Sequence, residues 1–157
     1  AAWRSQEPLT AGLVQPDEMY IQGISLGATR YEITRQWKDL GERGGLQVFH
    51  ETKTDAQGRE WDFLAAGFDQ YDRVILLKGT DFSCSRAPLA SWDDLKGMGV
   101  LPEFKIKTVP DWPDAEIVYY EDLGFFVLKV RSVAREFYLM APEAAGTTWE
   151  AVNAANS

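Results

Sequence analysis

Cysteine and histidine are almost absent from this chain of 157 residues, which contains only Cys84 and His50. A single cysteine excludes an intramolecular disulfide, so the fold must be stabilised by packing. One cysteine and one histidine cannot supply the ligands of a structural zinc site either. They also lack the signature of a catalytic pair, because the residues around Cys84 are "FSCSR". We therefore expect no metal, no cofactor and no catalytic residue.

Long apolar segments and basic clusters are missing as well. The longest apolar runs, such as 74–77 and 125–128, fall far short of the ~20 residues that a membrane helix requires. Lysine and arginine are scattered, and 24 acidic residues against 16 basic ones give a net charge of −8. This charge repels the phosphates of nucleic acids and anionic membrane surfaces. We expect a protein partner of unknown identity, no nucleic acid and no membrane span.

The first residues, Ala1-Ala2-Trp3, include neither a methionine nor a basic segment followed by an apolar one. Such a start is typical of a processed, exported protein, although a trimmed chain has the same appearance. We expect a periplasmic or secreted protein.

A helix start is encoded at Thr29. Glu32 follows three positions later, and the two side chains can form a capping box with the first backbone N–H groups of a helix. Apolar residues at 33, 37 and 40 recur at helical spacing, and Gly41 can end the helix in the left-handed conformation. The sequence therefore predicts a helix from Arg30 up to Gly41.

Strand-length apolar segments follow this helix. They lie at 46–53, 59–68 and 73–79, and the short turns between them are typical of an antiparallel meander. The order recurs 62 residues later: Ser91 and Asp94 repeat the helix-start signal, and 135–139 repeats 73–77. Segments at 104–109, 115–122 and 124–130 supply the other strands of this second half.

These signals predict an α+β fold of two tandem helix-plus-antiparallel-sheet units that form a concave sheet. The helices are expected on one face of the sheet, with the other face open. The expected organisation is an N-terminal extension at 1–19, a first unit at 20–80, a linker at 81–90, a second unit at 91–140 and a C-terminal tail at 141–157.

The segment "ISLGATRYEI" at 24–33 combines an apolar residue, a glycine, a threonine cap and a helix start. It resembles the start of the repeat in β-lactamase-inhibitor-protein-like domains, which are related to small outer-membrane assembly lipoproteins. Two such units stand in tandem in the inhibitor-like proteins and form a concave sheet surface, so the resemblance implies the same arrangement here. The chain departs from that family because it lacks a disulfide in each unit and has "PLASWDDL" where the second Gly-x-Thr signature would stand. In those inhibitors an acidic hairpin residue enters the target enzyme, and Asp55 lies in the comparable turn.

Aromatic residues are abundant, with six Trp, six Tyr and eight Phe. Outward Trp and Tyr side chains on a sheet are typical of protein-binding faces, whereas the alternative is that these residues fill the core. Tyr119 and Tyr120 are consecutive in a strand and must point to opposite faces. Trp112 stands between two prolines, either as a binding residue held in place or as a plug folded onto the sheet. The candidate partner-binding residues are Asp55, Trp61, Tyr71, Trp112, Tyr119 and Tyr120.

Pairs of carboxylates at 93–94, 111 with 114, and 121–122 offer groups for acid–base chemistry. Cap and turn roles explain them better, because Asp is favoured at both places. The leading hypothesis is a non-enzymatic, exported protein-binding or inhibitory protein that docks a partner on an open sheet face. The alternatives are a small hydrolase-type enzyme whose carboxylate pair is assembled by folding, or an envelope-assembly scaffold.

Overall fold

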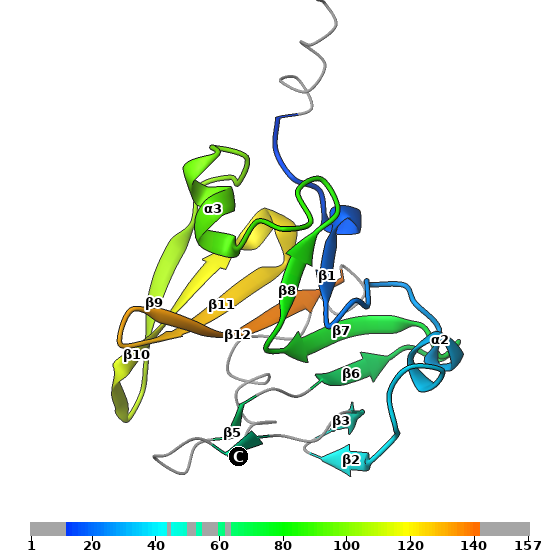
Figure 1. The fold of residues 1–157 in the computed structure, drawn as a ribbon. Helices are drawn as coiled ribbons and strands as arrows, with labels where there is room; N and C mark the ends of the chain where they lie inside the picture. The colour runs from blue at the N-terminus through cyan, green and yellow to red at the C-terminus, as the bar shows by residue number, and fades with distance from the viewer. Residues whose placement is uncertain (1–11, 44, 50–52, 55–59, 62–63, 142–157) are drawn as a thin grey trace, which may run out of the picture.

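The computed structural model describes residues 12–43, 45–49, 53–54, 60–61 and 64–141. Its main feature is an eight-stranded antiparallel sheet (Figure 1). From one edge to the other this sheet contains β2 (Gly41–Arg43), β3 (Leu46–Val48), β6 (Leu64–Phe68), β7 (Val74–Gly79), β12 (Val133–Met140), β11 (Phe125–Val130), β10 (Trp112–Tyr120) and β9 (Lys105–Val109). Two smaller sheets pair β1 (Met19–Ile21) with β8 (Phe82–Cys84) and β4 (Lys53–Thr54) with β5 (Glu60–Trp61).

Strands dominate the described part of the chain, at 47% against 15% for helix. The predicted α+β fold of two helix-plus-sheet units is therefore wrong, because the protein is mostly β and one sheet runs through both expected units. The helices are shorter than the sequence pattern indicated: α2 (Arg30–Thr34) has five residues and α3 (Trp92–Gly97) has six. Gly41, which we expected to end the first helix, instead opens strand β2 with a φ of 98°.

Both helix starts nevertheless follow the capping boxes that the sequence predicts. The Thr29 hydroxyl accepts a hydrogen bond from the backbone N–H of Glu32, and the Glu32 carboxylate accepts one from the backbone N–H of Thr29. Ser91 and Asp94 form the same reciprocal pair at the start of α3. The described residues also include two single turns of 3-10 helix, η2 (Pro16–Glu18) and η3 (Glu121–Leu123).

The middle of the main sheet is the pair formed by β7 and β12. Leu77 lies directly opposite Leu139 in this pair, and these are two residues that the 62-residue offset in the sequence equates. The two halves of the sheet have mirrored strand orders. From the outer edge to the centre, one half contains β2, β3, β6 and β7, and the other contains β9, β10, β11 and β12. The sheet is therefore joined at its centre by segments that lie far apart along the chain.

One face of the sheet packs against both helices and the β1–β8 pair, and we call it the helix-side face (Figure 1). Ile21 of β1, Ile33 of α2 and Leu95 of α3 belong to the same buried cluster as Leu77 and Phe125 of the sheet. Phe82 of β8 stacks on Phe125 with a centroid distance of 4.8 Å. Cys84 is buried in this cluster as well and forms no disulfide.

Much of the opposite face of the sheet is buried as well, which corrects the expectation of a fully open face. Ile117, Leu128 and Tyr138 lie on it and are buried within a second apolar cluster. The physical reason is visible in the strands, where neighbouring residues such as Val127 and Leu128 are both apolar and occupy different clusters. Near-continuous apolar strands are typical of sheets covered on both sides.

Within the described residues, no helix is long enough and apolar enough to cross a membrane.

Candidate functional site

The outer strand β9 leaves one side of its backbone without a neighbouring strand in the described part of the chain. The hydrogen-bond pattern of β10 shows which groups face outward. The N–H of Arg131 donates to the carbonyl of Asp114, the residue that the register places directly opposite it, over 2.8 Å. Antiparallel pairs alternate between bonded and non-bonded residues, so Glu116, Val118 and Tyr120 also bond toward β11. The backbone groups of the residues between them therefore point toward β9.

The register between β10 and β9 extends this alternation to the backbone groups of β9. Ile117 of β10 lies opposite Lys107 and Tyr119 lies opposite Lys105, so these two lysines bond inward to β10. The backbone N–H and C=O groups of Ile106 and Thr108 consequently point away from the sheet. This row of outward groups is a template to which another strand can pair.

Exposed apolar side chains accompany the outward backbone groups. Ile106 is 55% exposed, and both Phe104 and Met98 are exposed as well. Ile106 lies opposite Val118 of the helix-side cluster, so its side chain is on the side of the sheet that carries α3. We refer to Met98, Phe104, Ile106 and Thr108 as the β9 edge.

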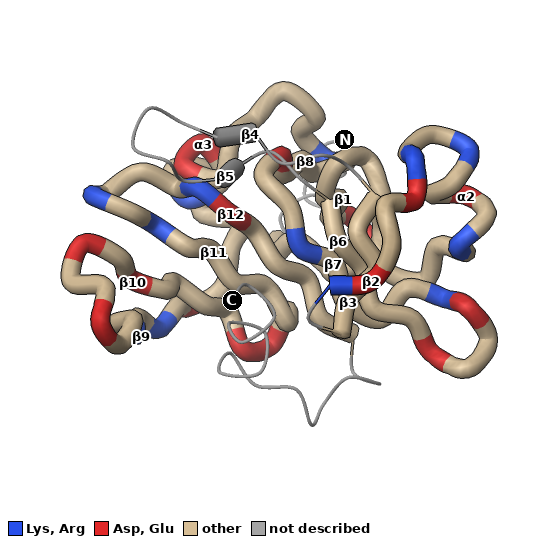
Figure 2. Tube along the Cα trace, turned by 90° about the horizontal axis from the view of Figure 1, so that it is seen from below, with Lys and Arg blue, Asp and Glu red and all other residues tan. Residues whose placement is uncertain are grey.

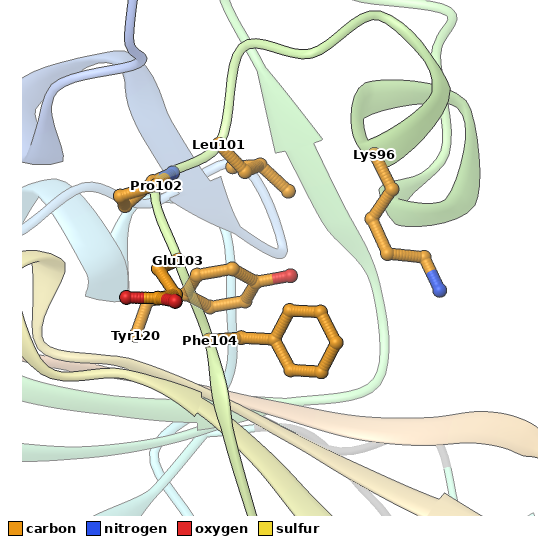
Figure 3. Close-up of a pocket in the computed structure, with 6 residues that line it drawn as sticks. All are labelled: Lys96, Leu101, Pro102, Glu103, Phe104 and Tyr120. Atoms are coloured by element: carbon orange, nitrogen blue, oxygen red, sulfur yellow. The ribbon is translucent and has the colours of Figure 1, made fainter.

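An open groove of about 260 Å³ lies next to the β9 edge, between α3 and β10. Figure 3 shows the rings of Phe104 and Tyr120 close together, with Lys96 extending from α3 beside them. The two ring centroids are 6.1 Å apart. The groove is lined by Lys96, Leu101, Pro102, Glu103, Phe104 and Tyr120.

The groove has a rigid base. Tyr120 is only 1% exposed, and its hydroxyl accepts a 3.0 Å hydrogen bond from the indole N–H of Trp92. Burial raises the pKa of the Tyr120 phenol above its usual value, and the hydrogen bond from Trp92 opposes this shift. The Lys96 ammonium group lies 4.1 Å from the centre of the Trp92 ring and 3.1 Å from the Asp93 carboxylate. Aromatic contacts therefore fix the floor of the groove while its mouth stays accessible.

Charge is distributed mainly toward turns and outer strands, while β6 and most of β11 are uncharged (Figure 2). Lys105 and Lys107 on β9 point to the opposite face, because they pair with Tyr119 and Ile117. The Lys105 ammonium group lies 2.6 Å from the Glu121 carboxylate, and this hydrogen bond raises the pKa of Lys105 above its usual value. Lys105 is therefore a fully charged side chain at the edge of the sheet.

The other edge of the sheet differs in length and chemistry. Strand β2 has only three residues, Gly41, Glu42 and Arg43, all of them exposed. A short edge strand with charged side chains discourages pairing with another chain. The two ends of the sheet are therefore unequal, and β9 is the one with apolar side chains beside its outward groups.

The four predicted partner-binding residues whose side chains the structure describes do not lie together in one site. Asp55 and the side chain of Trp61 lie outside the described residues, although the backbone of Trp61 belongs to β5. Tyr71 is 73% exposed in the turn before β7. Trp112 is half-buried at the start of β10 and packs against the opposite-face cluster, which matches the plug alternative.

Tyr119 and Tyr120 point to opposite faces, as strand alternation predicts. Tyr119 is half-buried and stacks on Phe126 of β11 with a centroid distance of 5.8 Å, on the opposite face. Tyr120 is buried on the helix-side face and reaches the surface only as the base of the groove. Of the four predicted residues whose side chains the structure describes, Tyr120 alone lines the groove.

Sequence reasoning missed Met98, Phe104 and Ile106. The signal for Phe104 and Ile106 was present in "FKIKTV", since two lysines flank the isoleucine and such lysines are common on edge strands. β9 is an edge strand because of the strand order of the sheet. Local sequence patterns do not predict this order.

Three polar side chains, Lys78, Glu136 and Tyr138, are buried at the β7–β12 pair. Lys78 is 3% exposed and Glu136 is 6% exposed, and the Tyr138 hydroxyl donates a 2.5 Å hydrogen bond to the Glu136 carboxylate. Burial lowers the pKa of Lys78 to about 8, against the attraction of Glu136. Burial also raises the pKa of Glu136, with Lys78 and Tyr138 opposing the shift. These groups compensate one another inside the sheet and do not reach its surface.

Most residues of the acidic pairs lie in the caps and turns that the sequence favours, whereas Asp114 lies in β10 and its carboxylate accepts a 3.2 Å hydrogen bond from Arg131. Asp93 and Asp94 are in the first turn of α3, and Asp111 occupies the β9–β10 turn with a φ of 63°. Glu121 and Asp122 form the η3 turn between β10 and β11. Among the described residues, no group of three or more His, Cys, Asp or Glu side chains is placed to hold a metal ion. His50 lies outside the described residues, so the structure does not test its pairing with Cys84.

Comparison with known protein families found no matching family model, and comparisons with curated proteins and with solved structures found no match. The resemblance to β-lactamase-inhibitor-protein-like domains therefore stays a prediction from the segment at 24–33.

Proposed function

We propose that this chain is a non-enzymatic protein-binding protein and that a partner protein docks on the β9 edge. The observation that carries this proposal is the coincidence of outward backbone groups at Ile106 and Thr108 with exposed apolar side chains. Main-chain hydrogen bonds to a sheet edge provide affinity, while side-chain pockets beside the edge provide selectivity. The groove floored by Tyr120 is such a pocket.

The docking surface differs from the one that the sequence favours, because much of the opposite face of the sheet is buried. Binding is favoured over catalysis because the paired carboxylates lie in caps and turns or, at Asp114, in an ion pair with Arg131. The buried pair of Lys78 and Glu136 does not reach the surface. The accessible chemistry of the β9 edge consists of apolar contacts and backbone hydrogen bonds, which hold a partner in place.

The test is capture of proteins from the native source on the immobilised chain, followed by mass spectrometry. We expect Ile106→Glu to lose a protein that the unaltered chain captures, because a carboxylate would be buried at the contact. Val133→Glu is the matched control, since Val133 is also an exposed apolar strand residue but lies on β12. Equal capture by both variants would contradict the proposal, and so would a chain that captures nothing at all.

A further inference from the structure

We infer that the partner segment is an extended strand that pairs with β9 and carries acidic residues at alternate positions. This inference rests on the proposed function, because it names the kind of partner that the β9 edge accepts. Three observations support it: the outward backbone groups, the different chemistry of the two sides of β9, and the effect of the lysines on self-pairing.

The outward backbone groups select an extended partner. Ile106 and Thr108 are two residues apart, so their N–H and C=O groups match the repeat of a β-strand and not that of a helix. β9 extends over five residues, Lys105–Val109, which is within the usual length of a strand in a globular protein. A partner strand laid along β9 would become the ninth strand of the sheet.

The two sides of β9 select the side chains of that partner. Ile106 points to the helix-side face, next to Phe104 and the groove. Lys105 and Lys107 point to the opposite face. A neighbouring strand also alternates, so its residues on the helix side meet apolar surface and its residues on the other side meet two ammonium groups. Alternating apolar and acidic residues satisfy both sides at once.

The Lys105–Glu121 ion pair does not prevent this. Both side chains are mostly exposed, and exposed ion pairs exchange partners at little cost in free energy. Glu121 lies in the turn beyond the end of β10. A partner carboxylate beside β9 can therefore share the Lys105 ammonium group with Glu121.

A second copy of this chain is a poor occupant of the edge. Two copies of β9 can pair in an antiparallel arrangement with either Ile106 or Lys107 opposite itself. The first arrangement places Lys105 opposite Lys107, and the second places Lys107 opposite Lys107. Like charges directly opposite each other destabilise a strand pair. The lysines therefore act against self-association and favour a strand of opposite charge.

The experiment uses three synthetic peptides of equal length that alternate Val with Glu, Gln or Lys. Binding to the full chain is measured by peptide fluorescence anisotropy, and the bound site is located by amide hydrogen exchange at Ile106 and Thr108. We expect the Glu peptide to bind about 2- to 30-fold more tightly than the Gln peptide, from two cross-strand charge pairs. The Lys peptide is expected to bind least tightly, and the preference for Glu should weaken as salt is added.

Two variants separate the backbone contribution from the charge contribution. Thr108→Pro removes an outward N–H and is tolerated at a sheet edge, so it should abolish protection and binding of all three peptides. Thr108→Val keeps the N–H and should bind normally. The double variant Lys105→Gln with Lys107→Gln should still bind the Gln peptide. Its affinities for the Glu and Gln peptides should be about equal.

The outcomes are distinguishable. Equal binding of the three peptides, or no binding of the Glu peptide, overturns the acidic-strand inference, whereas loss of partner capture in Ile106→Glu still supports docking at the edge. A dimer of the chain in sedimentation, abolished by Thr108→Pro, identifies a second copy as the occupant and also overturns the inference. Peptide binding that leaves the amides of Ile106 and Thr108 unprotected places the peptide elsewhere and overturns it as well.

Discussion

Replacing Gly124 with alanine provides a test of how closely β11 and β12 approach each other. Gly124 follows η3 and has a φ of 63°, which lies in the left-handed region. Its carbonyl accepts a 2.8 Å hydrogen bond from the N–H of Met140, so the two backbones are held together. A Cβ atom added at Gly124 would overlap the carbonyl oxygen of Met140. Because that atom belongs to the backbone of a central strand, no side chain can move aside to make room.

The expected loss of stability has two parts. A left-handed conformation costs a residue with a side chain roughly 1–2 kcal/mol. The overlap with the backbone of β12 adds a further cost of about 1–3 kcal/mol, as for overpacking in a core. Gly124→Ala should therefore destabilise the protein by about 2–5 kcal/mol, which corresponds to a decrease in Tm of roughly 4–20 °C for a chain of this size.

Gly99→Ala is the matched control. Gly99 has a φ of 71°, and no atom lies within 4 Å of an added Cβ, so only the conformational part applies. The assay is urea unfolding followed by tryptophan fluorescence, with thermal melting by circular dichroism as the second measurement. Asparagine tolerates the left-handed region, so Gly99→Asn should be almost neutral while Gly124→Asn stays destabilised. Equal effects at the two positions would refute the close approach to Met140.

Three further predictions concern side chains. Ser91→Ala should lower the free energy of unfolding by about 0.5–2 kcal/mol in urea, because the N-cap of α3 loses its acceptor. Tyr120→Phe should lower it by about 1–3 kcal/mol in the same assay, since the buried indole N–H of Trp92 loses its hydrogen bond. Glu136→Gln should lower the pKa of Lys78 below about 8 in an NMR titration, because Glu136 opposes the effect of burial. The folded-state pKa of Lys78 is below its ordinary value of 10.5, so the unfolded chain binds the proton more tightly and the unaltered protein should gain stability as pH rises from about 8 to 10.5.

Local signals in the sequence predicted local structure. The capping boxes at Thr29 and Ser91 start helices because each involves residues only three positions apart. The apolar segments that form β6, β7 and β9 to β12 were predicted as strands for a similar reason, since period and composition are local properties. The first helix is shorter than predicted because the chain joins the sheet soon after it: the N–H of Leu40 donates to the carbonyl of Val48, and β2 begins at Gly41. The fold class was wrong because one large sheet includes strands from both expected units.

Structural features that depend on pairing between segments far apart in the sequence could not be predicted from local patterns. The expected linker at 81–90 contains β8, which pairs with β1 over sixty residues earlier in the chain. The candidate site depends on the same kind of information, because the outward groups of Ile106 and Thr108 follow from the register with β10. Apolar doublets such as Val127-Leu128 did contain the evidence for burial on both faces, and they are a stronger guide than the count of aromatic residues.

The junction of β7 and β12 has a consequence for the speed of folding. Leu77 and Leu139 meet at the middle of the sheet, and the chain between them must close a loop of about sixty residues before their ladder forms. Strands β6 and β7, and strands β9 to β12, pair with their neighbours along the chain after short turns, so these can assemble early. Until β7 and β12 pair, each of these strands has an unpaired apolar edge. Association between chains through these edges competes with the pairing of β7 and β12 within one chain. Refolding yield should therefore decrease as protein concentration rises.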